Sequence, residues 1–436
     1  MQTSGLSLDQ APPLAIPARF FVTAPLAVIA AGALLFPMGA TPWTSPWYPQ
    51  VMAWTHLGTL GFLAMVMFGA LYQMTPVVAG TPVPKIRLAY LVHVLLAIGV
   101  AALEIGWYRG DPTLIQVGVH SLAGASALFA LPVAVGLFRS SAKDQTVSGM
   151  RIAIMGFAAV AAIGVILARG HYGGPFLASR PLVLQIHFNL ALLLWVGGLI
   201  TAVSWQVIPM FYLAPMPSAR EKNLLLALLG LGFAALVYCL LVAGQWVPDF
   251  WPHTFGKRMV MLAVAPAATA VWILHPICTL RALKKRKRSR PDASLLFWKA
   301  GMLVALTLLP LGAFAHFSDH PRWSMLWGWL AIWGWAGIIA HGMLMRIVPF
   351  LVWFHRMSPH VGLRPVPSMR GLLSQSRIKL GLRLHLASLI SGAVGIILSQ
   401  DWLAHLTGGL LVMTGSVLFS SLISTLQQFP KDDSHD

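Results

Sequence analysis

Apolar residues occur along the chain in long, nearly uninterrupted stretches, and polar residues gather in the short segments between them. A helix needs about 20 mostly apolar residues to cross the hydrocarbon core of a bilayer. Twelve stretches are long enough, and we expect each to be one transmembrane helix. They are 19–40, 50–78, 87–107, 113–138, 149–168, 180–213, 223–246, 257–282, 295–317, 323–353, 376–399 and 401–426. The pattern therefore predicts an all-α polytopic membrane protein with twelve transmembrane helices.

Composition narrows the class further. Hydrophobic residues make up 57% of the 436 residues and charged residues only 10%, whereas ordinary soluble domains carry about 25% charged residues. A soluble globular protein is therefore excluded. The two cysteines also exclude a scaffold held together by disulfides. We expect residues 1–436 to form a single membrane domain.

The formal net charge of +18 comes from lysine and arginine, and these residues are unevenly distributed. If the N-terminus is cytoplasmic, the cytoplasmic segments hold 23 of the 30 basic residues, including the run from Lys284 to Arg290. Basic residues near the ends of spans favour the cytoplasmic side. We therefore expect a bacterial-type inner-membrane protein with both termini in the cytoplasm. Topology explains the basic run, so no nucleic-acid partner is predicted.

Three predicted helices end in the same pattern, in which a long polar residue is followed by two others and then by proline. The pattern occupies residues 73–76, 206–209 and 346–349, with separations of 133 and 140 residues. Self-similarity at a fixed period indicates a repeated structural unit, and four predicted helices fit into each period. We therefore expect three pseudo-symmetric four-helix units, at about 19–140, 149–282 and 295–426.

Histidine is unusually frequent for so apolar a chain, with 15 histidines against 12 acidic residues. His56 and His187 stand near the outer starts of the second and sixth predicted helices, 17 residues before Gln73 and 19 before Gln206. An imidazole inside an apolar helix needs partners for both ring nitrogens. Two interpretations stay open: a hydrogen-bonded structural histidine, or a ligand of haem iron or copper, both of which bind imidazole well.

Other histidines and one arginine are further candidates. The predicted metal ligands are His56, His187 and four histidines at or near outer helix ends, namely His120, His316, His320 and His405. His341 lies deeper in the tenth helix, five residues before Arg346. We expect these two residues, like His56 and His187, to bind a cofactor. Arg346 either extends its charge to the cytoplasmic surface or pairs with a cofactor carboxylate or a substrate anion.

Twelve helices in three fours, with a histidine early in the second, resemble subunit I of the haem-copper oxidase superfamily. In that family the second helix supplies a low-spin haem ligand and the sixth a copper ligand, so the resemblance implies these roles for His56 and, approximately, His187. The chain departs from the family because its seventh helix, 223–246, has no histidine and its tenth lacks a His-x-His. His316 and His320 flank that region without the spacing. The resemblance therefore implies an oxidase-like architecture without a complete oxygen-reducing site.

The chain is more similar to the NnrS-type membrane haem proteins, which are linked to nitric-oxide stress. The similar segments are 54–56 (Trp-Thr-His), 61–62 (Gly-Phe), Gly69, Pro76, Gly80 and 206–211 (Gln-Val-Ile-Pro-Met-Phe). Trp54 stands where these proteins have the first histidine of a His-x-His, and Gln206 where they have arginine. The resemblance implies haem b as the cofactor, with copper as a second candidate metal, and leaves the number of haems open.

Three functions are compatible with these patterns. The first is an inner-membrane haem protein in redox or nitric-oxide chemistry, with an electron-transfer partner or a small gas as ligand; as an enzyme it would be a haem-dependent oxidoreductase. The second is a transporter of copper or another small solute, because 19 methionines and the outer histidines suit soft metal ions. The third is a structural or assembly subunit without a cofactor. The lipid bilayer is the partner common to all three.

Overall fold

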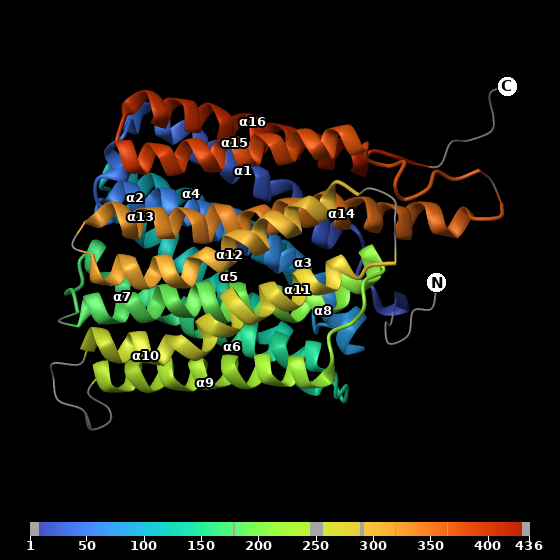
Figure 1. The fold of residues 1–436 in the computed structure, drawn as a ribbon, viewed down its shortest axis with the longest axis horizontal. Helices are drawn as coiled ribbons and strands as arrows, with labels where there is room; N and C mark the ends of the chain where they lie inside the picture. Colours follow the sequence, from blue (N-terminus) through green and yellow to red (C-terminus); the bar gives the residue numbers. More distant parts are fainter. Residues whose placement is uncertain are drawn as a thin grey trace. The chain divides into compact units, whose positions relative to one another are not determined.

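The structure is a computed structural model that describes residues 8–177, 179–244, 256–287, 292–318, 320–363 and 365–429. Every regular element within these ranges is a helix, and no strand occurs in them. Twelve helices of the described ranges are long and apolar enough to cross a membrane, which confirms the predicted all-α polytopic class (Figure 1). The end of the predicted seventh helix, at 245–246, and the basic residues at 288 and 290 lie outside the described ranges.

Most helix bounds agree with the predicted spans to within a few residues. The first four spans are α1 (Ala15–Met38), the succession α2 (Pro49–His56), η3 (Leu57–Ala64) and α3 (Met65–Ala79), then α4 (Leu88–Arg109) and α5 (Pro112–Arg139). The next four are α6 (Gln145–Ala168), the succession α7 (Arg180–Asn189), η5 (Leu190–Gly197) and α8 (Gly198–Tyr212), then α9 (Ala219–Ala243) and the succession α10 (Gly256–Thr269), η7 (Ala270–Leu274) and α11 (His275–Lys284). The last four are α12 (Ser294–Phe317), the succession α13 (Pro321–Trp329), η8 (Leu330–Gly337) and α14 (Ile338–Val352), then α15 (Gln375–Leu398) and α16 (Asp401–Leu426). The tenth span continues through η9 (Trp353–Met357) and η10 (Ser358–His360), beyond its predicted end at 353.

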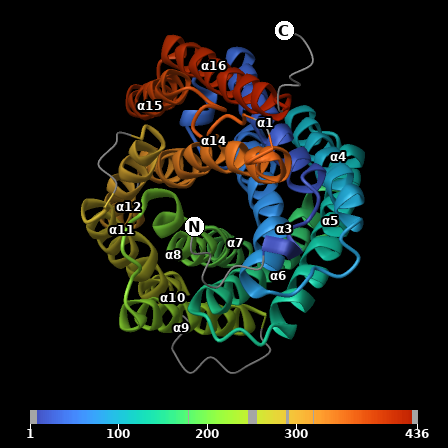
Figure 2. The ribbon, with the colours of Figure 1, turned by 90° about the vertical axis from the view of Figure 1, so that its right-hand side faces the viewer.

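The chain divides into two compact units. The terminal unit comprises Pro12–Leu71, Arg290–Val304 and Leu311–Asp436, and the central unit comprises Met1–Ala11, Tyr72–Ser289 and Ala305–Pro310. In the terminal unit α16 packs against both α1 and α15 (Figure 2). In the central unit α4 and α5 lie side by side. The arrangement as three four-helix units stays a prediction.

Glycines allow the closest helix pairs in each unit. A Cβ added at Gly32 of α1 would lie 2.6 Å from the backbone oxygen of Gly408 in α16. A Cβ added at Gly118 of α5 would lie 2.6 Å from the backbone nitrogen of Leu103 in α4. Small residues let helices approach closely in lipid, where van der Waals packing replaces the hydrophobic effect. These glycines therefore permit the close contacts of α1 with α16 and of α4 with α5.

The second, sixth and tenth spans share an interruption of their α-helical geometry. Each contains a π-helical segment of eight residues, beginning at Leu57, Leu190 and Leu330. Each segment is followed by an α-helix of 15 residues, namely α3, α8 and α14. The three starting positions are 133 and 140 residues apart, which are the separations of the proline pattern. The backbone therefore recurs in the register of the predicted sequence repeat, and π-helical turns often occur at functional sites.

Candidate functional site

Helix α14 carries two buried ionisable side chains in the terminal unit. His341 is fully buried and Arg346 is only 5% exposed. Both were predicted to bind a cofactor, and ionisable residues within a membrane span are costly unless they are paired. The partners of these two side chains therefore define the candidate site.

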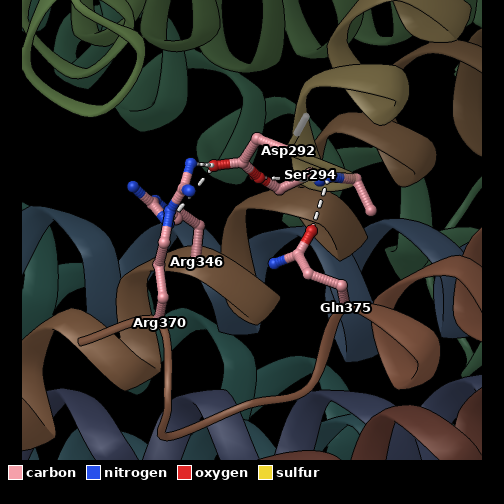
Figure 3. A network of polar contacts seen from close by, with 6 residues as sticks. Asp292, Ser294, Arg346, Arg370 and Gln375 are labelled. Carbon is pink, nitrogen blue, oxygen red and sulfur yellow. Dashed lines mark hydrogen bonds and ion pairs between the residues drawn. The ribbon is translucent and has the colours of Figure 1, made fainter. Parts of the chain in front are cut away.

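Arg346 is held by a carboxylate that lies just before α12 (Figure 3). Its Nη1 lies 3.5 Å from Oδ2 of Asp292, and the two side chains are 6% and 1% exposed. Nη2 of Arg370, in the segment before α15, lies 3.4 Å from the same oxygen. The guanidinium group of Arg346 is thus paired with a carboxylate inside the protein instead of being carried to the surface. The predicted pairing of Arg346 with a cofactor carboxylate stays a prediction.

The other carboxylate oxygen of Asp292 is also occupied. Oδ1 accepts hydrogen bonds from the backbone nitrogen and the hydroxyl of Ser294, the first residue of α12, at 3.1 and 2.6 Å. The side chain of Gln375, the first residue of α15, accepts a hydrogen bond from the backbone nitrogen of Ala293 at 2.9 Å. The network therefore ties α14 to the starts of α12 and α15 (Figure 3).

Opposing effects set the pKa of Asp292. Burial is the largest of them and raises the pKa, but the hydrogen bonds from Ser294 and the charges of Arg346 and Arg370 lower it and together prevail. The pKa of Asp292 is therefore lowered from its ordinary value, and the group is a carboxylate at neutral pH. Two guanidinium groups against one carboxylate give the network one net positive charge.

A second buried group joins α14 to α15. Nδ1 of His341 and Nδ1 of His385 are 3.1 Å apart, and both side chains are fully buried. Nε2 of His385 lies 3.0 Å from the backbone oxygen of Trp333 in η8, and the imidazole stacks on the Trp333 indole with ring centroids 3.9 Å apart. Trp333 in turn donates from Nε1 to the hydroxyl of Ser388 at 2.9 Å. These contacts hold the ring of His385 in one orientation.

Hydrogen bonding fixes the tautomers of the two imidazoles when both are neutral. A carbonyl oxygen only accepts, so Nε2 of His385 carries the hydrogen and its Nδ1 carries the lone pair. Nδ1 of His341 must then be the donor between the rings, which leaves the lone pair of His341 on Nε2. That nitrogen is buried and has no hydrogen-bond partner in the described part of the chain. It faces Gly381 of α15, where an added Cβ would lie 3.0 Å away.

The central unit contains a buried histidine with a different partner. Nε2 of His275, the first residue of α11, lies 2.9 Å from the hydroxyl of Ser204 in α8. The Ser204 hydroxyl also lies 2.7 Å from the backbone oxygen of Thr201. That carbonyl takes the hydroxyl hydrogen, so Nε2 of His275 donates to Ser204. His275 therefore depends on a neutral hydroxyl where His341 depends on a second imidazole.

His56 ends α2, directly before the π-helical segment η3. Its Nδ1 lies 2.8 Å from the backbone oxygen of Met52, so Nδ1 carries the hydrogen and Nε2 the lone pair. Two residues earlier, Trp54 stacks on Trp329 with ring centroids 5.3 Å apart, and Trp329 lies 6.3 Å from Trp333. Aromatic contacts thus join the second and tenth spans within one turn of His56.

His187 and His56 do not occupy equivalent positions in the repeat. Since the π-helical segments begin 133 residues apart, Asn189 takes the position of His56, and His187 takes the position of Trp54. His187 is half-buried in α7, and its Cε1 lies 3.2 Å from where a Cβ at Gly164 of α6 would be. The glycine therefore leaves room for the ring, and the two predicted ligands differ by two residues in register.

The four remaining predicted metal ligands are exposed at or near helix ends. His120 bonds through Nδ1 to the carbonyl four residues earlier at 2.8 Å, and His405 bonds through Nε2 to a backbone carbonyl of α1 at 3.1 Å. His320 caps the start of α13, and His316 lies in the last turn of α12. Within the described ranges, no group of three or more His, Cys, Asp or Glu side chains is arranged to hold a metal ion.

Sequence reasoning did not single out three members of these buried groups. His385 and His275 carry the same signal as His341, an imidazole in an apolar stretch, and could have been identified from it. Asp292 gives no such signal, because it follows a basic run in a polar segment and pairs with a residue 54 positions later.

Comparison of the chain with protein-family models and with curated proteins finds no match. The resemblances to oxidase subunit I and to NnrS-type proteins therefore stay predictions. Any function has to be argued from the chemistry of the residues themselves.

Proposed function

We propose that the chain is a multi-pass inner-membrane protein that binds haem b through His56. Its role would be redox or nitric-oxide chemistry, and not the complete reduction of oxygen. The observation that carries the proposal is the hydrogen bond from Nδ1 of His56 to the Met52 carbonyl, at 2.8 Å. A histidine that binds a metal commonly donates its other ring N–H to a backbone carbonyl or carboxylate, which fixes the tautomer and orients the ring.

The surroundings of His56 support the same interpretation. Nε2, the nitrogen with the lone pair, is the one that would bind iron, and the stacked Trp54 and Trp329 would exclude water near it. The π-helical segment that follows His56 breaks the regular helix at this position. When bound, haem supplies one-electron chemistry and a site for a small gas ligand. His187, which lies in the central unit, stays a separate candidate ligand for haem iron or for a copper ion.

The proposal includes an orientation. The distribution of lysine and arginine supports cytoplasmic termini, and with them a position of His56 in the outer half of the membrane. In that arrangement an electron-transfer partner would approach the outer face, and the Arg346 network would lie towards the cytoplasm.

Haem content of the purified full chain, expressed with added haem precursor, tests the proposal. His56→Ala is expected to lower bound haem, measured by pyridine haemochromogen absorbance, by on the order of tenfold or more. His120→Ala is the matched control, because His120 has the same Nδ1 bond to a carbonyl at 2.8 Å but is exposed. A wild-type protein without a Soret band, or equal haem in both variants, would refute haem binding through His56.

A transporter of copper or a small solute is the second candidate. It is favoured by the buried Arg346–Asp292 pair, because charges within spans often mark substrate pathways. Vesicles that contain the protein would be tested for uptake of copper ions. Copper uptake that persists in a haem-free His56→Ala protein and is lost in Arg346→Gln would favour transport over haem chemistry. If neither protein takes up copper, transport is contradicted and haem binding is the remaining one of these two candidates.

A further inference from the structure

We propose that the His341–His385 pair is a proton-binding site inside the membrane, which takes up one proton at Nε2 of His341 and holds the charge on His385. This inference is independent of haem binding. The observation behind it is Nε2 of His341, a ring nitrogen that has a lone pair, is fully buried and lacks a hydrogen-bond partner among the described residues. Leaving a buried acceptor unsatisfied is unfavourable, and a proton is the smallest ligand that satisfies it.

The existing hydrogen bonds provide a path for the charge. A proton from the aqueous phase adds to the lone pair of His341 Nε2, and the hydrogen on His341 Nδ1 passes to His385 Nδ1 along their 3.1 Å contact. His341 is then neutral with its hydrogen on Nε2, and His385 is an imidazolium that donates from both nitrogens. No electrons move, and the pair gains one proton and one positive charge.

His385 is the better of the two rings to hold that charge. Its Nε2 already donates to the Trp333 carbonyl at 3.0 Å, and a charged donor makes a stronger hydrogen bond than a neutral one. Its ring lies over the Trp333 indole at 3.9 Å with an interplanar angle of 14°, and tryptophan is the aromatic residue that best stabilises a cation over its face. His341 instead lies beside Phe297, with the two ring centroids 4.9 Å apart and the ring planes tilted by 54°.

No second proton is expected, because no described residue on the elements around the pair would balance a further positive charge. On the elements packed against the pair, several charged or titratable groups are exposed: Lys299 of α12, Arg377, Lys379 and Arg383 of α15, and Asp401 and His405 of α16. Arg346 pairs with Asp292, and Arg19 of α1 donates a hydrogen bond to the Ala15 carbonyl. Two further groups lie in η9, beyond the end of α14: Arg356 donates to the Leu426 carbonyl, and His355 contacts the ring of Phe354. Uptake is therefore expected to be a single step as the pH falls.

Nitrogen NMR of the ¹⁵N-histidine-labelled full chain in lipid bilayers tests the proposal. At alkaline pH we expect one coupled pair of rings, with the hydrogen on Nδ1 in one ring and on Nε2 in the other. On acidification we expect one imidazolium for the pair. Two rings with the hydrogen on Nε2, two imidazolium rings, or a pair that stays neutral until the protein unfolds would each overturn the proposal.

Variants assign the signals and locate the charge. His341→Gln and His385→Gln should each remove the coupled signal, whereas His275→Gln, which removes an equally buried imidazole bound to a hydroxyl, should leave it unchanged. If the first two variants do not fold, Trp333→Phe decides the location, because the smaller ring holds a cation less well. Proton affinity of the pair should then fall by about threefold or more, and an unchanged affinity would contradict the placement of the charge on His385.

Discussion

Helices α8 and α14 stand at equivalent positions of the predicted repeat, one in the central unit and one in the terminal unit. Each follows an eight-residue π-helical segment, runs for 15 residues and contains a proline near its end. Their buried groups nevertheless differ. The hydroxyl of Ser204 in α8 accepts a hydrogen bond from His275, whereas α14 supplies an imidazole of its own and carries Arg346 where α8 has Gln206.

The difference separates two properties of a repeated fold. The recurring backbone determines where polar side chains can point into the protein, and the residue types determine whether those positions hold neutral or charged groups. Hydroxyl and amide groups need only a hydrogen-bond partner, but a buried guanidinium needs a counter-charge. That requirement explains why Asp292 accompanies α14, and it makes the terminal unit the more sensitive of the two.

Replacing Arg346 of α14 by glutamine, the residue that α8 has at the equivalent position, is the strongest test of this difference. Arg346→Gln removes one of the two cations that face Asp292 in the described part of the chain, and Arg370 remains. Breaking a buried pair typically costs about 3–5 kcal/mol, and the remaining Arg370 puts the expected loss at the lower end of that range. The free energy of unfolding of the full chain in detergent measures the loss. Equal stability of Arg346→Gln and wild type would show that the pair does not stabilise the terminal unit.

A smaller loss is expected in α8. Ser204→Ala deprives the buried Nε2 of His275 of its acceptor, which should cost about 1–3 kcal/mol in the same unfolding measurement. Ser204→Thr retains the hydroxyl and is the matched control. If the Ser204→Ala and Ser204→Thr proteins have the same free energy of unfolding, the hydrogen bond does not stabilise the central unit, and the proposed difference between α8 and α14 is contradicted.

Acidification should give the smallest effect, and only in the terminal unit. Because the pKa of Asp292 is lower in the folded protein than its ordinary value of 3.8, the carboxylate contributes stability that is fully present above that ordinary value. The contribution is lost as the pH falls through the lower folded value. The net effect is small because burial opposes the favourable contacts. Stability measured against pH should lose this acid-side slope in Asp292→Asn, and an unchanged slope would assign the titration to another group.

The sequence was sufficient to predict the twelve spans, because the length and apolar character of a membrane helix leave few alternatives. The π-helical segments recur at the separations of the proline pattern, while the arrangement as three four-helix units stays a prediction. The sequence was not sufficient to pair His341 with His385 or Arg346 with Asp292, because these contacts join residues 44 and 54 positions apart that only tertiary packing brings together. The two-residue offset between His56 and His187 is already present in the sequence, as spacings of 17 and 19 residues before their glutamines, and the π-helical segments keep it.

The π-helical segments also reset the angular phase of the helices that contain them. Successive α-helical residues are turned by about 100° about the axis, and a turn with i→i+5 hydrogen bonds takes up more residues. Residues 49–56 and 65–79 therefore belong to two different helical wheels, although they form one span. Deleting one residue within 57–64 would rotate the half that carries His56 against the half that carries Pro76 by about 100°, while leaving both halves unchanged in sequence. In the second, sixth and tenth spans, the alignment of the two halves thus depends on the number of residues in the π-helical segment between them.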